Sequence, residues 1–334
     1  MKRRLSTALL ILLPLALLYV SLFVGRFAVS PRDVLHILAS RVVPLPHDWS
    51  DAADTIVIQI RLPRAVLAMV VGAGLALSGA AFQGMFRNPL VSTDILGVTA
   101  AAGFGAALAL LWSASALSLQ LLSFAFGLAG VGLAYALARV YGSAPMLMLV
   151  LSGIVVAAFF SALLSGIKYL ADPESRLPAI TYWLLGSLNG TSVRTLLVAV
   201  PCIGVGCAGL LSLSWPLNVL TMGEEEARSL GVRTEWLKGS VIVFATLVTS
   251  AAVSVCGIVG WVGLVIPHLA RLLVGPDHRA LFPWTLSIGA GYLLLMDDLA
   301  RTLTAGEIPL GILTALVGAP VFAFLLRRAR QTWQ

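Results

Sequence analysis

Charged residues are scarce in this chain. Lys, Arg, Asp and Glu together make up 11% of the 334 residues, whereas hydrophobic residues make up 59%, and the mean hydropathy is +0.97. A soluble domain carries about 25% charged residues. The composition therefore excludes a soluble globular protein and indicates an integral membrane protein. Because the apolar stretches are long and continuous rather than alternating, we expect an all-α protein.

Common sequence motifs for ATP binding, metal binding and nucleophilic catalysis are also absent from the sequence. The chain has no G-x-x-x-x-G-K-[ST] loop, so we do not expect it to bind ATP through a P-loop. It has no H-E-x-x-H, G-x-S-x-G or C-x-x-C pattern either. We therefore expect no catalytic residue and no cofactor on this chain.

Cysteine and histidine are too few, and too scattered, for a metal site. The three cysteines are an odd number and lie in apolar runs, which favours a role as small apolar side chains. His36 and His47 fall in one predicted outward loop, whereas His268 and His278 fall on the inward side. Metal sites need several convergent ligands, so we expect none here.

The apolar runs predict about ten transmembrane helices in a single domain covering residues 1–334, since each crossing needs about 20 apolar residues. The expected spans are 5–25, 62–84, 95–112, 117–138, 146–170, 193–213, 239–256, 258–274, 281–300 and 309–326, and Pro267 is expected to break the eighth. The net charge of +7 includes basic clusters at both ends of the chain (Lys2-Arg3-Arg4 and Arg327-Arg328, Arg330). Such clusters predict cytoplasmic termini and membrane lipid, not nucleic acid, as the neighbour.

Two predicted outward segments are polar. The first loop, about residues 26–60, is expected to hold a short helix from Pro31 with Ser30 as its N-cap. The second, Asp172 to Pro178, precedes an apolar stretch (Ala179 to Leu188) that is too short to span and suits a re-entrant or interfacial helix. Arg176 and Lys168 flank this mouth; they would either attract an anionic substrate or anchor the chain at the membrane interface.

A charged segment, about residues 216–238, interrupts the apolar runs. Gly223 followed by Glu224, Glu225 and Glu226 suits a helix N-terminus, and Leu230-Gly231 suits a helix end with a glycine cap. A short surface helix on a membrane chain that has no ATP-binding loop of its own indicates docking to a soluble partner. The alternative is a solvated connector.

Asp297, Asp298 and Arg301 are ionisable residues near the outer end of the ninth predicted span. Asp297 and Arg301 have the i,i+4 spacing of a helical salt bridge. A structural ion pair is favoured over a proton relay, because groups near the end of a span can reach the interface.

An ordered set of short strings runs from Arg61 to Phe322. The strings are Arg61-Leu-Pro-Arg64, Ser78-Gly79 with Gln83, Arg87-Asn-Pro-Leu90, Ile95-Leu-Gly-Val98, Trp183-Leu-Leu-Gly-Ser-Leu188, Gly223 through Leu230-Gly-Val232, Gly263-Leu-Val-Ile-Pro-His-Leu-Ala-Arg271, Asp277-His-Arg279, Asp297 with Ala300-Arg301, Glu307-Ile-Pro-Leu-Gly311 and Gly318-Ala-Pro-Val-Phe322. This set resembles the permease subunits of the FecCD family, the type II ABC importers for ferric siderophores, haem and cobalamin. Ser92-Thr93-Asp94 and Asp298 depart from the usual pattern, which weakens any inference about substrate.

The resemblance implies a type II ABC importer permease fold in the bacterial cytoplasmic membrane. The implied partners are a second permease subunit (a homodimer, or a closely related pair), two cytoplasmic ATPase subunits that hold ATP and Mg, and a soluble periplasmic or lipid-anchored binding protein. The ATPase-coupling loop would comprise Gly223, Glu224, Glu225, Ala227, Arg228, Leu230 and Gly231. Arg61, Arg64 and Arg301 would meet acidic groups of the binding protein; the alternative for Arg61 and Arg64 is anchoring a helix end.

A ferric siderophore is the first choice of substrate, haem the second and cobalamin an alternative. Arg176 and Lys168 would line the substrate pathway. A secondary ion-coupled carrier is the alternative mechanism, and it would need Asp297 and Asp298 as its coupling site. A membrane scaffold without transport is the third interpretation.

Overall fold

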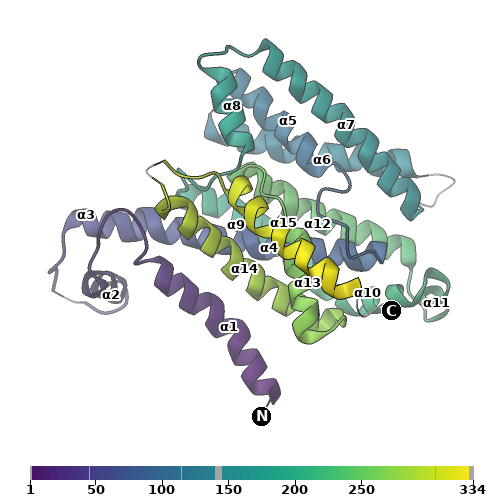
Figure 1. Cartoon of the computed structure of the whole chain (residues 1–334), viewed down its shortest axis with the longest axis horizontal. Coiled ribbons are helices and arrows are strands. Elements are labelled where there is room, and N and C mark those ends of the chain that lie inside the picture. The colour runs from purple at the N-terminus through teal and green to yellow at the C-terminus, as the bar shows by residue number, and fades with distance from the viewer. Residues whose placement is uncertain (1, 45, 114, 140–144, 305, 331–334) are drawn as a thin grey trace.

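The computed structural model describes residues 2–44, 46–113, 115–139, 145–304 and 306–330, and the regular structure in this part is helical (Figure 1). In chain order the elements are α1 (Lys2–Ser21), α2 (Pro31–Ser40), α3 (Asp51–Asp54), a π-helical segment (Thr55–Arg61), α4 (Leu62–Phe86), α5 (Val98–Leu111), α6 (Ala116–Ala138), α7 (Met146–Leu170), α8 (Arg176–Leu184), α9 (Val193–Ser212), α10 (Ser214–Met222), α11 (Glu224–Ser229), α12 (Thr234–Cys256), α13 (Val262–Val274), α14 (His278–Thr302) and α15 (Leu310–Arg330).

Six helices in the described part are long and apolar enough to cross a membrane: Asp51–Phe86, α6, α7, α9, α12 and α14. Four shorter apolar helices lie at Leu12–Ser21, Val98–Leu111, Val262–Val274 and Leu310–Leu325. Each of the ten predicted ranges overlaps one of these helices, which confirms an all-α membrane fold. The number of crossings stays a prediction, because four of the helices are shorter than a full span.

Helix α4 lies at the centre of the bundle and packs against α14, α12, α13 and α9. Glycines make this possible, because they let helix backbones touch. A Cβ atom at Gly72 would lie 2.3 Å from the carbonyl oxygen of Gly289, and one at Gly79 would lie 1.9 Å from that of Gly263. These contacts fix α4 against α14 and α13.

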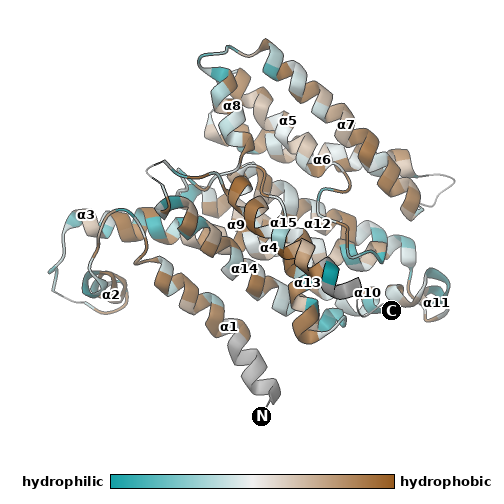
Figure 2. Cartoon of the chain, viewed as in Figure 1, coloured by the Kyte–Doolittle hydropathy of each residue, from teal (hydrophilic) through white to brown (hydrophobic). Residues whose placement is uncertain are grey.

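Helices α5, α6, α7 and α8 form a second group, which lies at the top of Figure 1. Phe104, Phe126 and Phe160 hold α5, α6 and α7 together, with ring centroids 5.0 to 6.2 Å apart. The other face of α7 leaves Leu147, Ile154 and other large apolar side chains exposed, and the helix is largely brown in Figure 2. Such a face suits contact with lipid or with another apolar helix.

The first predicted outward loop is shorter than expected. The predicted helix from Pro31 is confirmed, and the Ser30 side chain accepts a hydrogen bond from the Asp33 backbone N at 3.1 Å. However, residues 51–60 are not loop: the chain is helical from Asp51 through Phe86. Ser50 caps this helix, and Trp49, Ala53 and Val57 pack with α2 in a small core of their own. Tertiary packing, which composition does not reveal, extends the helix.

Three other boundaries also differ from the predictions. The segment 216–238 is largely helical, since it holds part of α10, all of α11 and the start of α12. Pro267 does not break α13, which continues from Val262 to Val274 around it. The short helix after the Asp172 mouth is Arg176–Leu184, and Gly186 follows it with φ +78°.

The ends of α4 and α14 define two ends of the bundle. The α3 end comprises α3, the start of α4 and the end of α14. The α11 end comprises α10, α11, the end of α4 and the start of α14. In Figure 1 these lie at left and right respectively, and the C-terminal end of α15 lies near the α11 end. The basic side chains of Lys2, Arg3, Arg4, Arg328 and Arg330 lie outside the described residues.

Candidate functional site

Helix α11 is the short charged helix that the sequence predicts. It runs from Glu224 to Ser229, follows Gly223 directly, and has acidic residues in its first turn. Gly231 ends it with φ +83°, a left-handed conformation that favours glycine. Within this helix Ala227 is fully buried, whereas the neighbouring Leu230 and Trp236 are 59% and 66% exposed. The structure therefore presents a small charged surface with two large apolar side chains beside it.

Lys238 holds α11 against α12. Its ammonium group lies 3.2 Å from Glu224 Oε1 and 2.6 Å from Glu235 Oε1, although the side chain is only 2% exposed. Arg228 adds a hydrogen bond of 3.1 Å from its Nε to Thr234 Oγ1. Lys238 lies on α12, which begins at Thr234, so the predicted charged segment 216–238 ends inside a helix. The buried pair fixes the angle at which α11 leaves the bundle.

Replacing Lys238 with methionine is expected to loosen α11. Methionine keeps the apolar contacts but removes the charge that both glutamates face, which costs about 1–3 kcal/mol for partly exposed partners. Hydrogen exchange of the segment 224–232, followed by mass spectrometry, should therefore become faster. Arg233→Met is the matched control, since Arg233 is exposed. Equal exchange in both variants would show that Lys238 does not hold the helix.

The predicted docking arginines meet at the α3 end, where all three are buried. Arg61 is 3% exposed, and Arg64 and Arg301 are 7% exposed. Arg61 donates to the backbone oxygens of Leu22, at 2.8 Å, and Phe27. These buried guanidinium groups form connections inside the bundle, and docking of a partner at Arg61, Arg64 and Arg301 stays a prediction.

Arg64 joins α4 to α14 and to the segment before α15. Its Nε donates to both carboxylate oxygens of Asp297 at 3.0 Å, and its two terminal nitrogens donate to Glu307 at 2.9 and 3.0 Å. Asp297 is fully buried. A charge buried to this degree is stable only when it is paired and hydrogen-bonded. The ion pair links segments more than 200 positions apart in the chain.

Arg301 pairs with both acids near the end of α14. Its Nε lies 3.9 Å from Asp297 Oδ2, and its terminal nitrogen donates to Asp298 Oδ1 and to the hydroxyl of Ser21 on α1. Ser21 in turn donates to Asp298 at 2.7 Å. The favoured interpretation of Asp297 and Arg301 as a structural ion pair agrees with these contacts, and Asp298 joins the same network.

A cavity of about 200 Å³ opens beside these arginines, and its charged lining consists of Arg26, Arg61, Arg64, Arg301 and Glu307. Arg26 is exposed and donates only to the backbone oxygens of Arg301 and Thr304, at 3.1 and 2.8 Å. Among the described residues, neither Arg26 nor Arg61 is within ion-pair distance of a carboxylate. The cavity therefore has excess positive charge. The sequence offers no local signal for the inclusion of Arg26.

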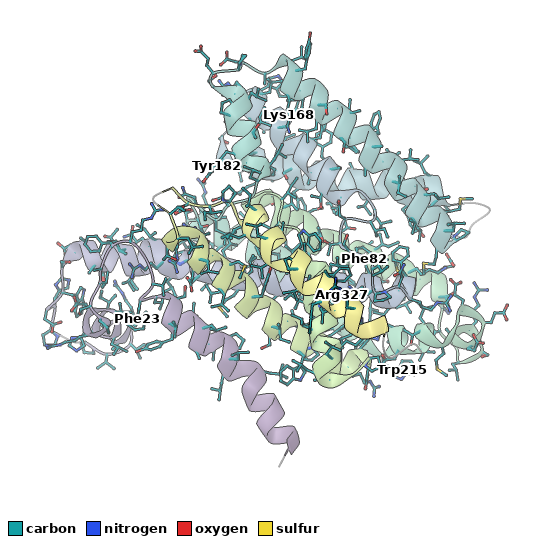
Figure 3. All side chains as sticks on the ribbon, in the orientation of Figure 1. Phe23, Phe82, Lys168, Tyr182, Trp215 and Arg327 are labelled. Atoms are coloured by element: carbon teal, nitrogen blue, oxygen red, sulfur yellow. The ribbon has the colours of Figure 1, made fainter. Side chains whose placement is uncertain are left out.

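Lys168 lies on α7 and Arg176 begins α8, both in the group of helices at the top of Figure 3, where Lys168 is labelled. Arg176 is partly buried and donates to Leu110 O at 3.4 Å and to the Ser113 hydroxyl, so it ties α8 to the end of α5. Hydrogen bonds from the side chain and backbone of Ser175 hold the pKa of the exposed Asp172 below its usual value. The role of Lys168 and Arg176 in a substrate pathway stays a prediction.

Among the residues that the structure describes, no group of three or more His, Cys, Asp or Glu side chains could hold a metal ion. Cys202, Cys207 and Cys256 are free thiols.

Comparison with known proteins gives a consistent result. The FecCD transport family model matches residues 10–328. The chain is 40% identical to the molybdate import system permease protein MolB of Haemophilus influenzae, over 93% of this chain and 92% of that protein. It is 44% identical to the cobalamin import system permease protein BtuC of Halobacterium salinarum, over 85% of this chain and 76% of that one.

A solved structure agrees with the sequence relatives. It is described as an inward-facing conformation of a putative metal-chelate type ABC transporter. Its chain is 39% identical to this one, with a TM-score of 0.87, and the match covers 98% of this chain and 99% of that chain. The similarity therefore extends to the whole bundle, including both ends described above.

Proposed function

The chain belongs to the FecCD transport family, and on this basis we propose that it is the transmembrane permease subunit of an ATP-driven importer for an iron chelate. It would pair with a second permease subunit, which we take to be identical, in the bacterial cytoplasmic membrane. Two ATPase subunits would bind at the α11 end, which would then face the cytoplasm together with both termini. A soluble binding protein would deliver the substrate at the α3 end.

One observation carries this proposal: α11 is a charged helix held rigidly at one end of an apolar bundle. The buried Lys238 pairs with Glu224 and so orients the helix, while Leu230 and Trp236 remain exposed beside it. A rigid, amphipathic surface of this kind suits docking to a soluble protein. The chain has no P-loop of its own, so the energy source must be the docked partner.

The arginine cavity at the α3 end supports docking of an acidic partner. Arg26 is the accessible cation, and Arg61 inside the cavity has no carboxylate partner in the described part of the chain. An acidic side chain of the binding protein would meet both there. Complementary charge of this kind mainly speeds and orients docking. The role we propose for Arg61, Arg64 and Arg301 is therefore to support a positive cavity that a partner enters.

The paired acids argue against a secondary ion-coupled carrier. Asp297 is bound by Arg64 and lies near Arg301, and Asp298 is bound by Arg301 and Ser21. A coupling carboxylate must be free to exchange its partner during transport, whereas both of these acids are held by arginine side chains that join separate helices. The network therefore favours an importer driven by a separate ATPase.

The identity of the substrate is a separate part of the proposal. We place a ferric siderophore first and haem second, with cobalamin as the alternative. The similarity to a molybdate permease adds an oxyanion to the substrates that need testing, and sequence analysis did not consider it. Among the candidate pathway residues, Arg176 and Lys168 are cations that would contact an anion at the mouth in the α5–α8 group, where Asp172 and Glu174 also lie.

Replacing Arg176 with alanine is expected to weaken uptake of an anionic chelate by roughly tenfold at low salt, because the remaining Asp172 and Glu174 would then outweigh Lys168 and lower the local concentration of anions. The effect should shrink as ionic strength rises. Initial uptake rates in proteoliposomes give the measurement. Arg32→Ala, which removes an exposed arginine on α2, is the control. Unchanged uptake with normal amounts of folded protein would remove Arg176 from the pathway.

The proposed function is tested by uptake into proteoliposomes that contain this chain and its ATPase partner. The binding protein is loaded in turn with ferric siderophore, haem, cobalamin and molybdate, with and without internal ATP. We expect ATP-dependent accumulation of one ligand. Accumulation without ATP under an imposed proton gradient would overturn the proposal and support the ion-coupled carrier.

A further inference from the structure

At the α11 end, one side chain joins α10 to α14. The Oδ1 atom of Asn218 accepts a hydrogen bond from the backbone N of His278 at 2.8 Å and contacts His278 Nδ1 at 2.6 Å. Its Nδ2 atom donates to Asp277 Oδ1 at 2.6 Å. The amide orientation is fixed, because the backbone N–H of His278 needs an acceptor and the carboxylate of Asp277 needs a donor. His278 Nδ1 must therefore carry a proton and donate.

Asp277 is held in its charged form by the same contacts. The backbone N of Arg279 donates to Asp277 Oδ1 at 3.0 Å, so that Asp277 caps the first turn of α14. This backbone hydrogen bond, followed by the one from Asn218, lowers the pKa of the Asp277 carboxyl group. Asn218 thus binds the capped start of α14 at three atoms.

His278 carries the contact onward to α4. Its side chain is 4% exposed, and a Cβ atom built on Gly84 would lie only 2.3 Å from His278 Nε2. The other side of the ring packs edge-on against Phe282, with centroids 5.2 Å apart. The imidazole ring of His278 therefore fills the space between α10, α4 and α14. A shift of α10 would displace this ring.

Helices α4 and α14 remain in close contact beyond this point. Gly72 and Gly289 bring their backbones into contact near the middle, and the Arg64–Asp297 ion pair closes the α3 end. Close-packed contacts of this kind transmit displacement because they have no free space to absorb it. A movement imposed on His278 would reach the arginine cavity through both helices.

We propose that Asn218 is the positioning residue that transmits movement of α10 and α11 to the α4–α14 pair. Gly223 is the single residue between α10 and α11, so a partner that moves α11 also moves α10. The inference rests on the proposed docking of an ATPase at α11. Lys238 provides a separate connection, from α11 to α12. The Asn218 contact is distinct because it leads to the arginine cavity at the opposite end.

The test measures how tightly ATP hydrolysis is coupled to substrate uptake in complexes of the full chain with its ATPase and binding protein. Asn218→Leu keeps the approximate size of the side chain but removes all three hydrogen bonds. We expect ATP hydrolysis to continue while uptake falls, so that the ATP hydrolysed for each substrate molecule imported rises roughly tenfold. The substrate is whichever of ferric siderophore, haem, cobalamin and molybdate the wild-type complex accumulates. Thr221→Val, on the exposed face of the same helix, is the control.

A reciprocal exchange separates coupling from folding. Asn218→Asp alone places two carboxylates together and should uncouple the complex. Adding Asp277→Asn removes the repulsion between the two carboxylates. In the wild-type chain Asp277 Oδ1 accepts from both Asn218 Nδ2 and Arg279 N, so the new amide must rotate to turn its nitrogen to the carboxylate and its oxygen to the first turn of α14, where asparagine is a favourable cap. We expect the double variant to regain most of the wild-type ratio of ATP hydrolysed to substrate imported. This rescue keeps the proposal falsifiable even if Asn218→Leu fails to fold.

The possible outcomes separate the inference from the proposed function. If the wild-type complex accumulates a substrate with ATP and the Asn218 variants keep its ratio, the transmission role is overturned and the importer stands. The same holds if hydrolysis and uptake fall together and the exchange rescues neither. If the wild-type complex accumulates no substrate with ATP, both proposals fail.

Discussion

Replacing Arg64 with alanine is expected to lower the free energy of unfolding by about 3–5 kcal/mol, the usual cost of leaving a buried charge without its partner. Arg64 supplies Asp297 with three hydrogen bonds of 2.9 to 3.0 Å, and Asp297 is fully buried. In the variant, Arg301 at 3.9 Å would be the remaining cation near Asp297. Denaturant titration in detergent micelles, followed by tryptophan fluorescence, measures the change.

The matched control for Arg64 is Arg41→Ala. Arg41 forms an ion pair with Asp54 at 2.6 Å, but its side chain is 52% exposed. An exposed pair contributes about 0–1 kcal/mol, because water solvates each charge when the other is removed. Combining Arg64→Met with Asp297→Asn should recover part of the loss, since it leaves no unpaired charge on Asp297. Equal destabilisation by Arg64→Ala and Arg41→Ala would show that burial of the α3-end network contributes nothing.

Adding a single methyl group at Gly79 should also have a large effect. The Cβ atom of Gly79→Ala would lie 1.9 Å from the carbonyl oxygen of Gly263 and 2.5 Å from its Cα. These are backbone atoms, so no side-chain rotation relieves the clash, and α4 and α13 must move apart. We expect a loss of about 3 kcal/mol for alanine. For valine we expect failure to recover folded protein.

Gly132→Ala on α6 provides the control for Gly79. Both glycines lie inside apolar helices, but a Cβ atom at Gly132 would have no atom within 4 Å. Alanine is favoured over glycine in a helix by about 1 kcal/mol, so this change should leave stability equal or higher. Thermal unfolding of both variants in the same detergent measures the difference in their stability. If Gly79→Ala is as stable as Gly132→Ala, the backbone contact between α4 and α13 is not as close as the structure shows.

The features predicted correctly from the sequence share a local cause. The positions of the apolar helices follow from runs of hydrophobic residues, since a helix in lipid satisfies its own backbone hydrogen bonds. The helix from Pro31 and the helix after Gly223 follow from capping residues within a few positions. The family similarity was likewise carried by short strings in order.

Other features could not be predicted because they depend on residues far apart in the chain. Arg61, Arg64 and Arg301 are arginines at predicted helix ends, and their charge alone suggests exposure. Their burial follows from partners such as Leu22, Asp297 and Glu307, which the fold brings to the same place. Lys238 and Asn218 are similar cases.

The sequence by itself therefore determined that the chain is a helical membrane protein of this family with a short charged helix after Gly223, because hydropathy and capping act over one or two helical turns. The tertiary structure alone decided which charges are buried, which acids Arg64 and Arg301 bind, and how Asn218 meets His278. The reason is that the free energy of a buried charge or amide depends on the partners around it in space, and these come from segments up to about 280 positions away, as with Ser21 and Arg301.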